Sequence, residues 1–179
     1  MSPVIAQVPA APPAIRSRPD AAEDIRAADA VNTARRIEFI SFAIGDDQYG
    51  VDIMAVREIK ALSNVTHLPK QPDYVRGVFN LRGVMVPIVD LRRRFGEGLT
   101  ENTPLHIVII VQIDGDQIGL IGDRLLDIVS VDASHIQQVP RTAPGAAADF
   151  LTGLVTHDNT MTALIDLPNL LADAKDIAA

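Results

Sequence analysis

The chain has 179 residues, of which 47% are hydrophobic, so it is long enough for one compact domain or two very small ones sharing a core. It contains no cysteine, which excludes a disulfide framework, a thiolate metal site and a cysteine nucleophile. Nucleic acids and anionic membranes are bound by clustered Lys and Arg, so a formal net charge of −7 argues against both as the main partner.

The first 36 residues differ in composition from the rest of the chain. Prolines crowd among alanines up to Pro19, and a mixed polar stretch runs from Asp20 to Arg36. Neither stretch offers a periodic apolar face to bury, which predicts a disordered Pro/Ala-rich tail over residues 1–36. Residues 1–14 lack the basic and apolar regions of a signal peptide, and no later run reaches the length of a membrane span. We therefore expect a soluble protein of the cytoplasm.

Strand signals begin at Ile37. A mostly apolar run from Ile37 to Ile44 ends at a Gly-Asp-Asp turn, and residues 48–52 follow at hairpin distance. A second apolar run, residues 105–113, is followed by the strong Asp-Gly turn signal and then by residues 117–121. The pattern predicts two antiparallel hairpins.

The two hairpins are related to each other, and so are two later segments. Residues 47–59 align without gaps with residues 116–128, and residues 74–91 align with residues 150–167. The identical pairs include Gln48 with Gln117, Gly50 with Gly119, Gly77 with Gly153, and Asp90 with Asp166. Related blocks in the same order indicate duplication of a unit of about 70 residues, which predicts two similar subdomains.

Each copy reads as two strands, a short helical turn and three further strands. Asp90 and Asp166 are placed as helix N-caps before short helices at residues 91–95 and 167–171, and Pro168 suits a first helical turn. About five short strands with Gly-rich turns are typical of small barrels, which remove their open edges by closing. The predicted fold is all-β, with two five-stranded barrels that share an apolar seam, and with short helices that include a C-terminal one.

No arrangement of residues points to catalysis, a cofactor or a metal. The four histidines, His67, His106, His135 and His157, are too far apart in sequence for a helical metal pair. The chain has no Gly-x-Ser-x-Gly elbow, no phosphate-binding loop and no dinucleotide-binding glycine pattern. A small hydrolase that uses His67 or His157 with nearby Asp residues is the alternative from another class. It requires a polar pocket that holds a histidine and a carboxylate within hydrogen-bond reach.

Two places in the first copy contain arginines, and the second of them, the hairpin tip, separates the two copies sharply. The basic run Arg92-Arg93-Arg94 follows Asp90, and in an acidic chain a solvated helix face is a better interpretation than an anion site. The predicted hairpin tip reads Asn80-Leu81-Arg82-Gly83, where the second copy has Thr156-His157-Asp158-Asn159. Gly83 can supply a positive φ, and Arg82 presents a five-donor fork suited to a carboxylate; a plain turn arginine is the competing interpretation.

These segments carry a resemblance to a known family. Residues 47–53, 56–59 and above all 77–91, with Asn80-Leu81-Arg82-Gly83 inside, resemble CheW, the bacterial chemotaxis coupling protein. The resemblance covers about residues 37–171 and implies two intertwined five-stranded SH3-like barrels without enzymatic activity or cofactor. It divides the chain into a tail (1–36), a CheW-like domain (37–171) and a C-terminal tail (172–179).

The resemblance also implies partners. Members of this family bind the regulatory domain of a CheA-type histidine kinase and the cytoplasmic tip of chemoreceptors, which places the kinase under receptor control in membrane-associated arrays. The expected protein is therefore a cytoplasmic adaptor, with no nucleic-acid partner and no direct membrane insertion. An adaptor of a related array, governing pili, development or gene expression, would share every motif above.

The site that the resemblance implies consists of eight positions. They are Val56, Glu58, Gly77, Arg82, Gly83, Ile107, Ile128 and Gly153. Glu58 and Arg82 are expected to form an ion pair near a receptor groove between the subdomains. The apolar face of a receptor helix would contact the apolar members of the set.

Overall fold

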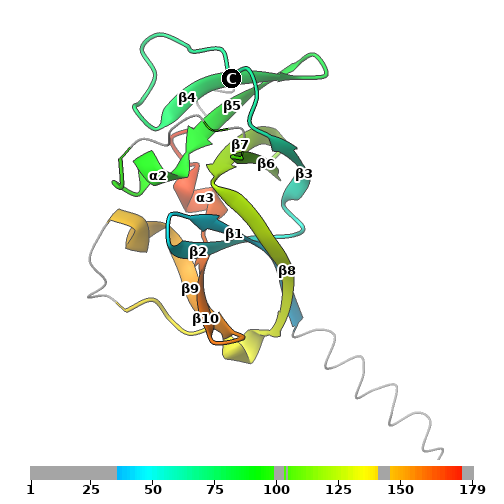
Figure 1. Ribbon diagram of the computed structural model, residues 1–179, viewed down its shortest axis with the longest axis vertical. Coiled ribbons are helices and arrows are strands. Elements are labelled where there is room, and N and C mark those ends of the chain that lie inside the picture. Colours follow the sequence, from blue (N-terminus) through cyan, green and yellow to red (C-terminus); the bar gives the residue numbers. More distant parts are fainter. Residues whose placement is uncertain (1–35, 99–102, 104, 141–145, 175–179) are drawn as a thin grey trace, which may run out of the picture. The chain divides into compact units, whose positions relative to one another are not determined.

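The computed structural model of the chain describes residues 36–98, 103, 105–140 and 146–174. By compactness the chain divides into residues 1–34 and residues 35–179, and every described strand and helix belongs to the second unit (Figure 1). The tail predicted over residues 1–36 lies outside the described residues except for Arg36. The C-terminal tail predicted over residues 172–179 is described only as far as Ala174.

The described residues form ten strands, two short α-helices and two 3-10 helices. In chain order they are β1 (Arg36–Ile44), β2 (Asp47–Asp52), β3 (Val56–Ala61), β4 (Val75–Leu81), β5 (Val84–Asp90), α2 (Leu91–Arg94), β6 (Ile107–Ile113), β7 (Asp116–Gly122), β8 (Arg124–Asp132), η1 (Ala133–His135), η2 (Ala146–Phe150), β9 (Leu151–His157), β10 (Thr160–Ile165) and α3 (Leu167–Leu170). The mainly β fold predicted from the sequence is confirmed.

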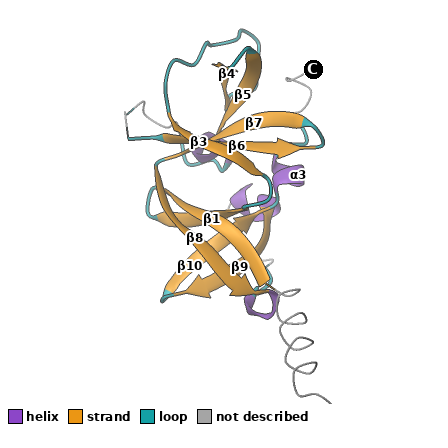
Figure 2. Cartoon of the chain, turned by 90° about the vertical axis from the view of Figure 1, so that its right-hand side faces the viewer, coloured by secondary structure: helices purple, strands orange, loops and turns teal. Residues whose placement is uncertain are grey.

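The strands form two five-stranded sheets. Sheet 1 has the order β8-β1-β2-β10-β9, and sheet 2 has the order β3-β6-β7-β5-β4 (Figures 1 and 2). Sheet 1 therefore combines two strands of the first copy with three of the second, and sheet 2 does the reverse. The repeat pattern alone does not say which strands share a sheet, and the intertwined arrangement implied by the resemblance is confirmed.

Each sheet is closed into a barrel by one isolated bridge. Thr66, in the segment after β3, pairs with Val78 of β4, so that segment reaches across to the other edge of sheet 2. Gln137, beyond β8, pairs with Leu154 of β9 and closes sheet 1 in the same way. We call the closed sheets barrel 1 and barrel 2.

The short helical turn expected after the second strand of each copy is present in the first copy, where the Ala55 N–H donates to the Asp52 carbonyl oxygen at 3.1 Å and the Val56 N–H to that of Ile53 at 3.2 Å, and it is wrong for the second. In the first copy, residues 53–55 form a turn in which the Met54 backbone N–H donates to Asp52 Oδ1 at 2.8 Å. In the second copy, Asp123 alone separates β7 from β8. The chain leaves one sheet and enters the other at these points, through this single turn in the first copy and through one residue in the second.

The repeat is preserved in atomic detail where β2 and β7 run parallel to β10 and β5. Leu164 pairs with Gly50, and Ile88 pairs with Gly119. A Cβ atom on Gly119 would lie 2.5 Å from Ile88 Cδ1, and one on Gly50 would lie 3.0 Å from Leu164 Cδ2. The matched glycines therefore let bulky neighbours cover these two strands, which explains why both copies have glycine there.

One large core joins the two barrels. It contains buried side chains from both sheets and both helices, among them Phe42, Leu120, Phe95 and Leu170. The helices begin as predicted, because Asp90 Oδ1 accepts from the Arg93 N–H at 3.2 Å and Asp166 Oδ1 accepts from the Asn169 N–H at 3.1 Å. The shared core is the apolar seam expected from the sequence.

The three arginines of α2 do not form a solvated face, so that interpretation is wrong. Each one pairs with a carboxylate from another part of the chain. The pairs are Arg92 with Asp123 at 2.6 Å, Arg93 with Asp73 at 2.8 Å, and Arg94 with Asp173 at 3.0 Å. The Arg94 guanidinium also lies 4.1 Å from the ring centre of Tyr74 and 4.7 Å from that of Phe150, which are matched positions of the two copies. The run ties separate segments together.

Replacing Arg94 with alanine is expected to lower the free energy of unfolding by about 1–3 kcal/mol, because a largely buried arginine loses two cation–π contacts together with its ion pair to the exposed Asp173. The Arg94 side chain is 14% exposed, whereas the neighbouring Arg93–Asp73 pair is 36% and 80% exposed. Arg93→Ala is therefore the matched control and should cost at most about 1 kcal/mol. Urea unfolding compares the two variants, and equal costs would contradict this account.

Glu97, just after α2, should respond to pH. Partial burial, with Asp47 and Asp123 nearby, raises the pKa of its carboxyl, although Arg92 works in the opposite direction. The folded state then holds this proton more tightly than the unfolded state, so ionised Glu97 destabilises the fold at neutral pH. Glu97→Gln should raise the melting temperature at pH 7, and the gain should vanish below about pH 4. A lower melting temperature of the variant at pH 7 would refute this.

Candidate partner-binding site

An ion pair joins β3 to the turn between β4 and β5. Glu58 Oε2 lies 3.4 Å from Arg82 Nη2 and 3.6 Å from Lys60 Nζ. The Arg82 side chain is 79% exposed and that of Glu58 is 24% exposed. The pair implied by the resemblance is therefore present, but a long and exposed pair contributes only about 0–1 kcal/mol to stability.

The β4–β5 turn holds Arg82 in an unfavourable backbone conformation. Arg82 has φ 52° and Gly83 has φ 90°, and the Gly83 N–H donates to Asn80 Oδ1 at 2.8 Å. The matched turn of the second copy has Asp158 at φ 48° and Asn159 at φ 61°. Asp and Asn tolerate the left-handed region, whereas arginine does not favour it. The turn alone therefore does not explain why an arginine occupies this position.

A shallow pocket of about 400 Å³ surrounds this ion pair. Its lining residues are Arg57, Glu58, Leu81, Arg82, Val84 and Gln117. Val84 and the neighbouring Met85 are large apolar residues that remain 53% and 57% exposed. The surface at the tip of barrel 2 thus combines basic groups with exposed apolar side chains, a composition that suits a protein partner.

Two of the predicted site glycines serve the fold. A Cβ atom on Gly77 would lie 2.1 Å from the Thr66 carbonyl oxygen, and Gly77 has φ 141°. A Cβ atom on Gly153 would lie 2.5 Å from Ile136 Cγ2. Each of these two glycines precedes a residue of a barrel-closing bridge, and a side chain on it would collide with the segment that pairs there. Closure of each barrel therefore requires glycine at this position. Gly83 differs, since nothing lies within 4 Å of an added Cβ atom there.

The apolar members of the predicted set do not form one cluster. Val56 pairs with Val111 at one end of the β3–β6 ladder, and Ile107 pairs with Ala61 at the other, roughly 15 Å away along the strand. Both are partly buried against the main core. Ile128 lies on β8 in sheet 1 and is 60% exposed. The residues that the structure brings together are Glu58, Arg82 and Gly83, with Val56 two residues before Glu58.

Sequence reasoning missed Lys60, Arg57, Val84 and Met85 at this surface. Lys60 follows Glu58 by two residues, and that spacing places both side chains on one face of a strand. Val84 and Met85 follow the turn directly and begin a mostly apolar strand, so the sequence gives no sign that these two residues are exposed. The period-two pattern of β3 could therefore have placed Lys60 beside Glu58. The exposure of Met85 could not be predicted in this way, because it depends on which segments cover the end of barrel 2.

Histidine–carboxylate pairs occur, but not in a catalytic setting. His157 Nε2 lies 3.3 Å from Asp158 Oδ2, on a turn where the two side chains are 48% and 89% exposed. His106 Nε2 lies 3.6 Å from Asp123 Oδ1, and that carboxylate also binds Arg92. His67 Nδ1 lies 3.4 Å from the Arg76 carbonyl oxygen. Among the described residues, no group of three or more His, Cys, Asp or Glu side chains is arranged to hold a metal ion.

The model of the CheW-like domain family matches residues 38–175. The chain belongs to this family. Its members are non-enzymatic scaffold proteins of chemotaxis, so the hydrolase alternative is wrong and the adaptor prediction is confirmed. No helix of the described residues is long and apolar enough to cross a membrane.

Several relatives carry the family name. A chemotaxis protein CheW of Klebsiella aerogenes is 38% identical over 75% of this chain and 81% of its own length. A probable chemotaxis protein CheW of Rhizobium etli is 37% identical over 79% of this chain and 92% of its own length. The crystal structure of the scaffolding protein TtCheW from Thermoanaerobacter tengcongensis is similar, with a TM-score of 0.70 and 30% identity. The match covers 75% of this chain and 92% of that one. The intertwined double barrel is thus the CheW fold.

Proposed function

We propose that this CheW-like chain binds two specific surfaces: the cytoplasmic tip of a chemoreceptor and the regulatory domain of a CheA-type histidine kinase. It acts in the cytoplasm at membrane-associated receptor arrays. Coupling then requires no catalysis, because bound receptor and bound kinase bias each other's conformations through the shared adaptor. The observation that carries the proposal is that Arg82 is exposed and has a strained backbone conformation, at a turn position where the second copy has aspartate.

We assign direct partner contacts to the surface around the ion pair. Arg82, Glu58 and Gly83 form its centre, and Val56, two residues before Glu58 on β3, is assigned to the same surface. An exposed arginine next to exposed apolar side chains is the kind of anchor that dominates protein interfaces. Ile128 and Ile107 are assigned to apolar partner contacts elsewhere on the domain. Gly77 and Gly153 are assigned an indirect role through barrel closure.

Calorimetric titration with the purified kinase regulatory domain and, separately, with a soluble receptor cytoplasmic fragment tests this proposal. Arg82→Ala should keep the fold and weaken at least one of the two interactions by tenfold or more. Arg93→Ala removes an arginine of α2 and should change neither affinity by more than twofold. Unchanged binding of Arg82→Ala to both partners would refute the assignment.

The segment before the domain should be dispensable for these interactions. The family model begins at residue 38, and the described strands and helices begin at Arg36. We expect a chain that begins at Arg35 to bind both partners within twofold of the full chain in the same titrations. Loss of either interaction on truncation would show that residues 1–34 take part in partner binding.

A further inference from the structure

One side chain contacts both barrels at the point where the chain crosses from sheet 2 to sheet 1. Asp123 is the single residue between β7 and β8. On the side of barrel 1, its Oδ2 accepts from the Gly45 N–H at 2.6 Å, and its backbone N–H donates to the Ala43 carbonyl oxygen at 2.9 Å. On the side of barrel 2, the same Oδ2 accepts from Arg92 Nη2 at 2.6 Å, and Oδ1 lies 3.6 Å from His106 Nε2. The Asp123 carboxylate therefore joins the two barrels.

The contacts of this carboxylate are short, partly buried and directional. A distance of 2.6 Å to the Arg92 guanidinium is at the short end for a charge-assisted hydrogen bond, and the Arg92 and Asp123 side chains are only 29% and 20% exposed. Apolar burial has no preferred direction, so the shared core fixes the relative orientation of the barrels less sharply than directed hydrogen bonds do. Arg94 also contacts both copies, but through ring faces and the 70% exposed Asp173. The Asp123 contacts are therefore the more restrictive connection.

The repeat does not require a carboxylate at this place. In the alignment of residues 47–59 with residues 116–128, Met54 is the match of Asp123. Met54 lies in the turn at the other crossing and is 81% exposed. At that crossing the Ile53 N–H donates to the Glu38 carbonyl oxygen at 3.1 Å, a contact that depends on no side chain. The fold therefore makes one crossing without a carboxylate, so the contacts of Asp123 are specific to the other.

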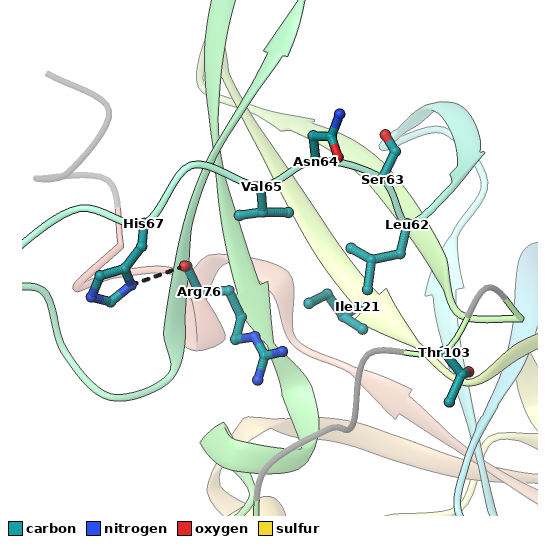
Figure 3. A pocket seen from close by; sticks show the side chains of 8 residues that line it. All are labelled: Leu62, Ser63, Asn64, Val65, His67, Arg76, Thr103 and Ile121. Carbon is teal, nitrogen blue, oxygen red and sulfur yellow. Dashed lines mark hydrogen bonds between the residues drawn. The ribbon is translucent and has the colours of Figure 1, made fainter.

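Two other arginine–carboxylate contacts nearby stay within barrel 2. Arg76 of β4 lies 3.6 Å from Asp90 at the end of β5. Figure 3 shows the Arg76 side chain in a pocket whose other lining residues, such as Ile121 of β7, also come from barrel 2 and the segments beside its strands. Arg93 of α2 pairs at 2.8 Å with Asp73, just before β4. The Arg93–Asp73 pair is therefore a matched control for a contact between the barrels.

The Asp123 carboxylate lies between the two strands that carry assigned partner contacts. β5 begins after the turn that contains Arg82, and its other end leads into α2 and Arg92. β8 begins directly after Asp123 and carries Ile128, which is 60% exposed. A strand, a directed contact and a second strand thus connect the place of Arg82 with that of Ile128. Contiguous packed elements of this kind can carry energetic coupling between two sites.

We propose that Asp123 is a positioning residue for coupling. Its carboxylate sets the orientation of one barrel relative to the other, and this orientation transmits partner binding between the surface around Arg82 and β8. The positioning step rests on the contacts above, whereas the transmission step rests on the proposed function. A residue that only stabilised the fold would change the melting temperature, but neither the orientation of the folded barrels nor the coupling.

Pulsed EPR distances between spin labels on the full chain test the positioning step, and no native cysteine interferes with labelling. One label pair spans the barrels, at Ser63→Cys and Ser130→Cys, and a control pair lies within barrel 1, at Ser130→Cys and Thr156→Cys; all three positions are exposed. Asp123→Ala should broaden the distance distribution between the barrels roughly twofold and leave the control pair unchanged. Asp73→Asn should change neither distribution. An unchanged distribution between the barrels in folded Asp123→Ala would overturn the proposal.

Arg92→Gln breaks the same contact from the other side, and it decides the matter if Asp123→Ala does not fold. It should broaden the distribution between the barrels to a similar extent. The double variant Arg92→Gln/Asp123→Asn should add little further, because both changes remove one shared contact. A folded Arg92→Gln with an unchanged distribution would also overturn the proposal.

Titration with the kinase regulatory domain, with and without saturating receptor fragment, tests the transmission step. In the unmodified chain, bound receptor should change the affinity for the kinase domain by about fivefold or more. Asp123→Ala should bind each partner alone within about twofold of the unmodified chain, but the effect of bound receptor should fall below about twofold. An unchanged effect in Asp123→Ala, or an equal loss in Asp73→Asn, would overturn transmission through Asp123. Failure of the unmodified chain to bind either partner would refute the proposed function instead, and the spin-label distances would still decide the positioning step.

Discussion

Arg82→Asn is expected to stabilise the protein and to weaken partner binding at the same time. The variant places Asn-Gly in a turn whose two central residues both have positive φ, and this dipeptide is the preferred one for such turns. Removing the strain of an arginine at positive φ should raise the free energy of unfolding by about 1 kcal/mol. Loss of the 3.4 Å ion pair with Glu58 should reduce that gain by only about 0.3 kcal/mol. Thermal unfolding should therefore show a melting temperature about 2 °C higher.

The same variant should lose about 2 kcal/mol of binding free energy, or roughly thirtyfold in affinity, if Arg82 anchors a partner. Arg82→Lys separates charge from fork geometry, because it keeps the charge and the unfavoured backbone position. It should show intermediate affinity without a gain in stability. A more stable Arg82→Asn that binds both partners normally would reduce Arg82 to a plain turn residue.

Gly77→Ala is expected to lower the free energy of unfolding by about 3–4 kcal/mol. Losses of this size occur where a substitution causes a severe steric clash or strains the backbone. The added methyl group would collide with the Thr66 carbonyl oxygen at 2.1 Å, and alanine is strained at φ 141°. Relief would require breaking the Thr66–Val78 bridge that closes barrel 2. Urea unfolding of the variant should show the loss, and the melting temperature should fall by about 10 °C.

Gly83→Ala is the matched control, since Gly83 also has a positive φ but has nothing within 4 Å of an added Cβ atom. It should cost only about 1 kcal/mol, from backbone strain alone. At a temperature where Gly77→Ala is still folded, its affinity for both partners should match that of the unmodified chain. A stable Gly77→Ala that fails to bind would instead place Gly77 directly in the interface.

Much of the fold follows from local signals in the sequence. The turn glycines, the N-caps at Asp90 and Asp166 and the internal alignment predict ten strands in two related sets, because each depends on a few neighbouring residues. The exchange of strands between copies depends on contacts between distant residues, such as the parallel pairing of Ile88 with Gly119. No local pattern specifies that pairing, and the arrangement came only from the resemblance.

The part of the candidate site that could be predicted from the sequence is the residue whose type is unusual for its place in the fold. Arg82 in a turn is such a departure, and it was found from the difference between the two copies. The arginines of α2 were misinterpreted because their partners, Asp123, Asp73 and Asp173, are distant in sequence. The crowding around Gly77 likewise depends on Thr66, which lies in the segment that follows β3 and pairs with β4. The sequence alone therefore could not show whether Gly77 is needed for the fold or for partner binding.

Coupling requires that one chain bind receptor and kinase together, and sedimentation velocity of the three components measures this. The chain would first be saturated with the regulatory domain of the kinase from the same cell, and the receptor cytoplasmic fragment would then be added. The account predicts a faster-sedimenting complex that contains all three, and less of it with Arg82→Asn. Displacement of the kinase domain by the receptor, or failure of either partner to bind, would contradict the coupling function.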